Sequence, residues 1–275
     1  MLKAVIFDLD DTLMPDEAAA DAAIIAVAEQ PRAIHNVAPE DLRVSVRRIS
    51  RALIRANPIV RDYDSFEVSS WEALTAGFAG DDPEMTALRE WAPRFRHEVW
   101  MAALAENGVN DPVLADRLAS MYQDERRARY APFPDVLPVL GILKTRYRLG
   151  VITNGPADLQ RAKLARSGLE AWFPVRVISR EVGVAKPDPR IFAIALERLG
   201  VTAAEAIYVG DSPKHDIEGA HASGIKAVWL QRDGAAGIKP VAQGGGVESE
   251  NVPADAVIHT LAELVPLLDT MADSA

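Results

Sequence analysis

Cysteine is absent from the 275-residue chain. Its absence excludes a thiol nucleophile, a zinc site built on thiolates and any disulfide framework. Long apolar runs are also missing, because the longest candidate, at residues 22–28, is far shorter than the roughly 18 residues that cross a bilayer. We therefore expect neither a disulfide-stapled fold nor an integral membrane protein.

Positive charge is in short supply. The chain has 30 Lys and Arg residues against 40 Asp and Glu residues, which gives a formal net charge of -10. This sign opposes non-specific binding to nucleic acid or to an anionic membrane surface, so neither is an expected partner. The N-terminus also lacks the long apolar stretch of a signal peptide, and we expect a cytoplasmic location.

The composition is otherwise that of an ordinary folded protein, with 49% hydrophobic and 25% charged residues. The length allows one large domain or two smaller ones. Short apolar runs typical of buried strands occur at residues 4–7, 149–152, 175–178, 207–209 and 227–230, with a weaker run at 256–258.

Segments with helical periodicity separate the later runs. They span residues 158–167, 189–199 and 216–223, and each is followed by a glycine where a helix C-cap is expected: Gly168, Gly200 and Gly224. Alternating strands and helices predict an α/β fold, with a Rossmann-like parallel sheet flanked by helices.

Strand-like runs vanish between residues 15 and 130, where Ala, Arg and Glu dominate in helical periodicities. We predict an all-helical domain at residues 15–130, inserted into an α/β core domain made of residues 1–14 and 131–275. Glycine and proline are frequent at residues 233–255, which predicts a surface loop.

Acidic residues follow two of the predicted strands. Asp8 and Asp10 come directly after the first strand, and Asp211 and Asp216 follow the strand at 207–209. Ligands bind at the carboxyl ends of strands in an open α/β sheet, so the four carboxylates are expected at one edge. Such carboxylates repel one another unless a cation separates them, and ligands that are all oxygen favour Mg²⁺ over zinc. We predict a magnesium site.

Groups suited to an anionic oxygen are expected at the same edge. Thr153 and Asn154 follow the second predicted strand and offer a hydroxyl and backbone N–H groups. Lys186 stands in the sequence AKPDP at residues 185–189, where the prolines restrict the backbone and limit where the ammonium can point. The pattern predicts a placed cation.

Taken in order, these motifs resemble those of the haloacid dehalogenase superfamily, in its phosphatase-like branch with an inserted helical cap. Motif one is DLDDT at residues 8–12, motif two is TNG at 153–155, motif three is Lys186-Pro187, and motif four is GDS at 210–212 continuing to Asp216. The match covers the predicted α/β domain, and the insertion at 15–130 lies where this family carries its first type of cap.

The resemblance implies roles for the four carboxylates. Asp8 would be the nucleophile that becomes an aspartyl phosphate, and Asp10 the general acid and then the general base. Magnesium would be held by the carboxylates of Asp8 and Asp211 and by the backbone carbonyl of Asp10, with Asp216 holding a bound water or acting as a further ligand.

The resemblance also implies an activity. Thr153, Asn154 and Lys186 would bind the phosphoryl oxygens of the substrate. The expected reaction is Mg²⁺-dependent hydrolysis of a small phosphomonoester.

Related activities remain as alternatives. A 2-haloacid dehalogenase shares the first aspartate but needs no leaving-group acid at the position of Asp10, and a phosphosugar mutase shares all four motifs. A phosphonate-cleaving relative needs a lysine in its cap, and residues 15–130 contain none. A non-catalytic phospho-receiver also combines carboxylates, threonine and lysine at a sheet edge, but its phosphoacceptor follows a later strand.

Other polar residues have simpler interpretations. Asp11 and Asp188 are interpreted as helix or turn caps. Residues 42–55 predict an ordinary amphipathic helix, with an apolar face and an opposite arc that holds five arginines: Arg43, Arg47, Arg48, Arg51 and Arg55.

Overall fold

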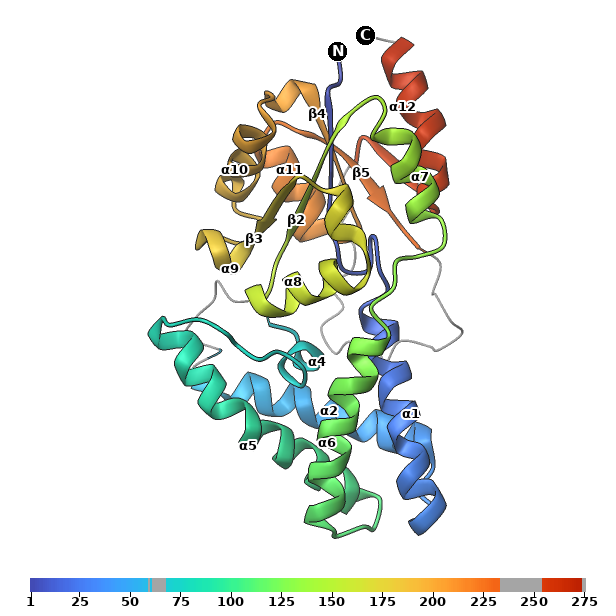
Figure 1. The fold of residues 1–275 in the computed structure, drawn as a ribbon, viewed down its shortest axis with the longest axis vertical. Coiled ribbons are helices and arrows are strands. Elements are labelled where there is room, and N and C mark those ends of the chain that lie inside the picture. The colour runs from blue at the N-terminus through green and yellow to red at the C-terminus, as the bar shows by residue number, and fades with distance from the viewer. Residues whose placement is uncertain (59, 61–67, 233–253, 274–275) are drawn as a thin grey trace.

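The computed structural model describes residues 1–58, 60, 68–232 and 254–273, and Figure 1 shows the chain as a ribbon. A six-stranded sheet has the order β3-β2-β1-β4-β5-β6, and every neighbouring pair is parallel. The strands are β1 (Ala4–Phe7), β2 (Arg148–Thr153), β3 (Val175–Ile178), β4 (Ala206–Gly210), β5 (Lys226–Leu230) and β6 (Ala256–Ile258). The predicted parallel α/β fold is confirmed.

Strand β1 lies in the middle of the sheet and is buried on both faces. Its four side chains have no exposed surface. Val5 and Phe7 pack into one apolar core and Ala4 and Ile6 into the other, since successive residues of a strand point to opposite sides. Its apolar sequence therefore reflects helices on both faces of the sheet.

The helices of the α/β part divide between these two cores. Helices α7 (Val136–Leu143), α8 (Ala157–Arg166) and α12 (Leu264–Asp273) contribute to the core of Val5 and Phe7. Helices α10 (Pro189–Leu199) and α11 (Gly219–Ala222) contribute to the other core, together with the π-helical segment η3 (Pro213–Glu218). The short elements are η1 (Leu169–Trp172), α9 (Ser179–Val182), η2 (Ala203–Glu205) and η4 (Leu261–Glu263).

One predicted helix differs from the structure in its start and its type. The segment expected at 216–223 begins at Pro213, and its first part is π-helical. Ser212 caps this turn by accepting the backbone N–H of His215 through its hydroxyl, and π-helical turns are often found at functional sites. All but the last two residues of the loop predicted at 233–255 lie outside the described residues.

Residues 17–128 are helical wherever the structure describes regular elements. The helices are α1 (Glu17–His35), α2 (Pro39–Ala56), α4 (Ser70–Ala73), α5 (Pro83–Glu106) and α6 (Pro112–Ala128), and Figure 1 shows them grouped on one side of the α/β part. Trp100 of α5 and Tyr122 of α6 are fully buried, with ring centroids 5.9 Å apart.

No helix in the described part of the chain is long and apolar enough to span a membrane. The division into two domains at residues 15 and 130 stays a prediction; we call residues 15–130 the helical insertion.

The arginines of α2 differ from one another in exposure, which the helical pattern did not indicate. Two of the five, Arg43 and Arg47, are buried, with 3% and 1% of their surface exposed. Asp21 of α1 lies 2.6 Å from Arg43 and 3.0 Å from Arg47 and is itself buried. The helix is amphipathic as predicted, but these two arginines of its polar arc are buried because their charge partner lies on another helix, which the pattern of a single helix does not reveal.

We predict that Asp21→Asn lowers the free energy of unfolding by about 3 kcal/mol, because two buried guanidinium groups lose their shared carboxylate. The control is Glu106→Gln at the end of α5, which breaks an exposed ion pair with Arg48 of α2 and should change stability by about 0.5 kcal/mol or less. Urea denaturation of the full chain measures both. Equal effects of the two variants would contradict the importance of the buried pair.

Candidate active site

Three carboxylates converge at the carboxyl edge of the sheet. Asp8 follows β1, Asp211 follows β4, and Asp216 lies in η3. The backbone N–H of Asp8 donates to the carbonyl of Val209 at 2.9 Å. Because β1 and β4 are paired in this way, Asp8 and Asp211 lie side by side at the ends of the two strands. Oxygens of the three carboxylates lie within 4.8 Å of one another. The fourth carboxylate expected with them, that of Asp10, lies in a separate group with Asp16 and Glu72.

The ammonium of Lys186 lies among these carboxylates. It contacts Asp8 Oδ1, and it donates to Asp216 Oδ1 at 2.7 Å and to the hydroxyl oxygen of Tyr208 at 3.1 Å. The Tyr208 hydroxyl in turn donates to Asp216 Oδ1 at 2.9 Å. The sequence analysis missed Tyr208, whose ring belongs to the apolar run of β4 while its hydroxyl reaches the site.

This group carries more negative than positive charge. Three carboxylates face one ammonium, and burial raises the pKa of Asp8 to about 6 although Lys186 opposes the shift. Burial, together with Asp8 and Asp216, also raises the pKa of Asp211 well above its usual value. The hydroxyl of Thr12 donates to Asp211 Oδ1 at 3.1 Å. A surplus of two negative charges on hard oxygen donors fits a divalent cation such as Mg²⁺.

Thr153 and Asn154 lie at the end of β2, next to β1 in the sheet. The side-chain amide of Asn154 donates to the carbonyl of Lys186 at 3.0 Å, and its Oδ1 accepts the backbone N–H of Lys186 at 2.9 Å. These two hydrogen bonds fix the main chain that carries Lys186. Contacts of Thr153, Asn154 and Lys186 with a phosphoryl group stay predictions.

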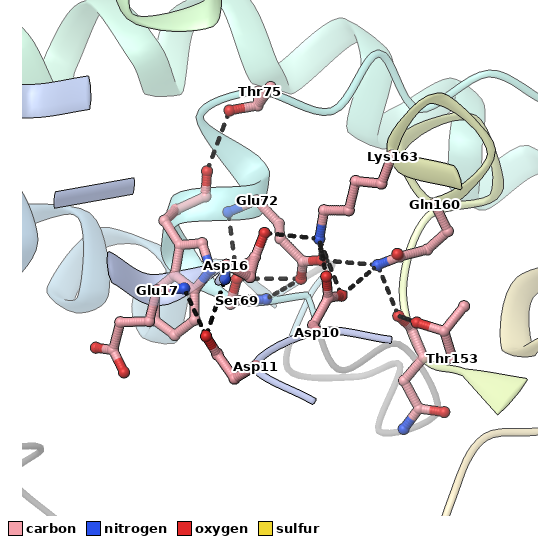
Figure 2. Close-up of polar contacts among 12 residues, drawn as sticks. Asp10, Asp11, Asp16, Glu17, Ser69, Glu72, Thr75, Thr153, Gln160 and Lys163 are labelled. Carbon is pink, nitrogen blue, oxygen red and sulfur yellow. Dashed lines mark hydrogen bonds and ion pairs between the residues drawn. The ribbon is translucent and has the colours of Figure 1, made fainter. Parts of the chain in front are cut away.

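Asp10 belongs to a second group of charges, shown in Figure 2. Lys163 of α8 is fully buried and donates to both carboxylate oxygens of Asp10 at 2.9 Å. The same ammonium lies 2.9 Å from Asp16 Oδ1 and 3.1 Å from Glu72 Oε1. Gln160, one turn earlier on α8, donates to Asp10 Oδ2 at 3.0 Å. Because Lys163 reaches all three carboxylates, an ammonium already occupies the place where a metal ion could bind.

Asp16 belongs to this second group and contacts two cations. Burial opposes its ionisation, but Lys163 and Arg126 outweigh burial and hold its pKa well below the usual value. Arg126 of α6 lies 2.6 Å from Asp16 Oδ1, and the indole N–H of Trp71 donates to Asp16 Oδ2 at 2.6 Å. Burial raises the pKa of Asp10 well above its usual value even though Lys163 lowers it.

The sequence analysis missed Lys163, Gln160 and Glu72. A signal for Lys163 was present, because it follows Leu159 by four residues and so lies on the buried face of the predicted helix. A lysine on such a face needs a partner, but the helical pattern could not name Asp10 or Glu72.

Asp11 and Asp188 act as caps, as predicted. Asp11 Oδ1 accepts the backbone N–H groups of Asp16 at 2.9 Å and Glu17 at 3.2 Å, which are unpaired donors at the start of α1. Asp188 Oδ1 accepts the backbone N–H of Arg190 at the start of α10. Asp11 therefore orders the chain as it enters the helical insertion.

The family model of the haloacid dehalogenase-like hydrolases matches residues 2–224. The chain therefore belongs to this family of hydrolases. Within the family it falls in the phosphatase-like branch, and it is an enzyme.

Two relatives cover most of the chain. It is 37% identical over 240 residues to a phosphoserine phosphatase of Thermus thermophilus, covering 87% of this chain and 91% of the relative. It is 34% identical over 235 residues to a glyceraldehyde 3-phosphate phosphatase of Methanopyrus kandleri, covering 84% and 85%. Among solved structures, a 2-haloacid dehalogenase from Pseudomonas syringae pv. Tomato is 29% identical, with a TM-score of 0.54 over 98% of this chain and 100% of that one.

We predict that Gly210→Ala weakens binding of a divalent cation about tenfold or more, because an added Cβ would lie 2.3 Å from Cγ of Asp216 and displace its carboxylate. Gly141→Ala on α7 is the control, since an added Cβ there meets no atom within 4 Å. The readout is the rise in the thermal unfolding midpoint with increasing Mg²⁺. Identical titration curves for Gly210→Ala and Gly141→Ala would contradict the placement of Asp216.

Proposed function

We propose that this chain hydrolyses small phosphomonoesters in a Mg²⁺-dependent reaction that passes through an aspartyl phosphate on Asp8. The observation that carries the proposal is the pair of acids on one loop with separate surroundings. Asp8 lies with Asp211, Asp216 and Lys186 in the group that has surplus negative charge. Asp10 lies two residues later, in contact with a different lysine. One carboxylate is thus suited to attack and the other to move protons.

The first half-reaction forms the covalent intermediate. A carboxylate oxygen of Asp8 attacks phosphorus while the bond between phosphorus and the leaving oxygen breaks. Asp10 gives its proton to the leaving oxygen, so the product departs as a neutral alcohol. Lys186, held by the side chain of Asn154 through its main chain, neutralises charge on the phosphoryl oxygens.

The second half-reaction returns the enzyme to its starting state. Asp10, now ionised, takes a proton from water as the water oxygen bonds to phosphorus and the bond to Asp8 breaks, which releases inorganic phosphate. Asp8, Asp211 and Asp216 would hold Mg²⁺, with the backbone carbonyl of Asp10. The bound ion supplies electrostatic stabilisation for the phosphoryl group and orients it.

The dehalogenase alternative fits less well. A dehalogenase needs no acid for a halide leaving group, whereas Asp10 here is half-buried and held by two side chains of α8. The relatives that cover most of the chain are named as phosphatases of small phosphorylated compounds. A mutase would use the same residues but return the phosphoryl group to a sugar, so release of inorganic phosphate separates it from a phosphatase.

The substrate is testable with a panel of phosphomonoesters. We expect release of inorganic phosphate from alkyl phosphates of few carbon atoms, and the panel includes O-phosphoserine and glyceraldehyde 3-phosphate because the relatives are named for them. A purified protein that releases halide from 2-chloropropionate, but no phosphate from any member of the panel, would overturn the proposal.

Removal of metal tests the role assigned to the surplus negative charge. We predict that a chelator abolishes phosphate release and that added Mg²⁺ restores it, because the phosphoryl group is itself anionic and must approach three carboxylates. Asp211→Asn should need a higher Mg²⁺ concentration for half-maximal rate, by about tenfold or more. Full activity in chelator would remove magnesium from the proposal.

The two aspartates should fail in different ways when changed. Asp8→Asn should form no phosphoenzyme, because it lacks the nucleophile. Asp10→Asn should accumulate phosphoenzyme with an aryl phosphate, since a good leaving group departs without an acid while the attacking water lacks its base. Intact-protein mass spectrometry detects the added phosphate. Normal turnover by Asp8→Asn would show that the nucleophile was wrongly assigned.

A further inference from the structure

The second charge group joins two parts of the chain that are far apart in sequence. Lys163 and Gln160 come from α8, which packs in the core of the sheet, whereas Glu72 comes from α4 in the helical insertion. Asp10 is 153 residues from Lys163 and lies between the two parts (Figure 2). Any movement between the helical insertion and the sheet must act on these contacts.

Lys163 is the centre of the group. Its ammonium donates to Asp10 at 2.9 Å and to Glu72 at 3.1 Å, and its side chain has no exposed surface. An ammonium has three N–H donors and no acceptor, and the carboxylates of Asp10, Asp16 and Glu72 surround it. Because the Lys163 side chain has no exposed surface, its ammonium depends on these carboxylates for its hydrogen bonds.

Gln160 repeats the same connection with a neutral group. Its side-chain nitrogen lies 3.0 Å from Asp10 Oδ2, 3.0 Å from Glu72 Oε1 and 2.9 Å from the carbonyl of Asn154. Two neighbouring side chains of α8 thus hold the same pair of carboxylates. Glu72 is fixed from its own side as well, because Ser69 donates to its other oxygen through both backbone and hydroxyl.

We infer that Lys163 is a positioning residue that holds the carboxylate of Asp10 for proton transfer, and that Glu72 makes this placement depend on docking of the helical insertion. The inference rests on the proposed function, because it concerns the acid and base of that reaction. When Glu72 is docked, Lys163 and Gln160 are held from both sides, and the carboxylate of Asp10 has one orientation.

The geometry separates this role from two others. A metal site is excluded at this group because the ammonium occupies its centre. Lys163 also does not form an isolated ion pair, because it divides its donors between Asp10, Asp16 and Glu72, which come from different parts of the chain. Asp16 already has Arg126 as a partner, so Asp10 and Glu72 are the members that depend on Lys163 and Gln160.

The test compares two leaving groups in the full-length protein. The substrates are 4-nitrophenyl phosphate, whose leaving group needs no acid, and the alkyl phosphate that the wild-type protein hydrolyses fastest in the panel. For Lys163→Met we expect kcat/KM to fall about 100-fold with the alkyl phosphate and less than about threefold with the aryl phosphate, because a misplaced acid affects only the first. Phosphoenzyme should accumulate with the aryl phosphate, since Asp10 also serves as the base.

A second variant guards against loss of folding in Lys163→Met. Glu72→Gln keeps the shape of the side chain and removes its charge. It therefore weakens the contact between the helical insertion and Lys163, while Asp10 and Asp16 still balance the buried ammonium. We expect a smaller loss in the same direction, about tenfold with the alkyl phosphate and little with the aryl phosphate.

Asp158→Ala is the matched control. Asp158 lies on the same helix and accepts the backbone N–H of Gly77 in the helical insertion at 2.8 Å, and it has no contact with Asp10. If docking alone matters, its loss changes kcat/KM by one factor for both substrates.

The outcomes separate the inference from the proposed function. Equal losses with both substrates in Lys163→Met and Glu72→Gln would overturn the inference while leaving the phosphatase intact. A wild-type protein that hydrolyses neither substrate would overturn the proposed function, and the inference with it. A leaving-group-dependent loss in the folded variants, but not in Asp158→Ala, supports both.

Discussion

Carboxylates that are removed from water must be balanced by cations, and the edge of the sheet is organised by this requirement. Asp8 and Asp216 are balanced in part by Lys186, and Asp10 by Lys163. Each lysine is buried and comes from a different segment of the chain. The loop of Lys186 and helix α8 are therefore held against the end of β1 by charge as well as by apolar packing.

The two groups of charges around Lys186 and Lys163 differ in net charge. The group around Lys186 keeps a surplus of negative charge on oxygens, which suits it to a metal ion and an anionic substrate. The group around Lys163 also contains Arg126, so its charges are nearly matched. Asp8 and Asp10 are two residues apart but are governed by different neighbours. The chain can thus give two identical side chains different tasks.

The sequence predicted the features that depend only on neighbouring residues. The apolar run of β1 and the acid that ends it are adjacent, so both the strand and the position of Asp8 at its end were predicted correctly. The pairing of Lys163 with Asp10, and that of Arg43 with Asp21, join segments whose order in space no single pattern specifies. Burial of these cations became evident only once the neighbouring helix was placed.

The contact between Asp16 and Arg126 has a consequence for how the chain can vary. Asp16 stands where the helical insertion begins and Arg126 lies near its end, 110 residues later, yet their charged groups are 2.6 Å apart. The insertion therefore leaves and rejoins the sheet at nearly one point, and closing longer or shorter connections between two such pinned ends costs little extra entropy. A different set of helices that keeps these two residues can be exchanged at this junction as a unit, without rebuilding the edge of the sheet beneath it.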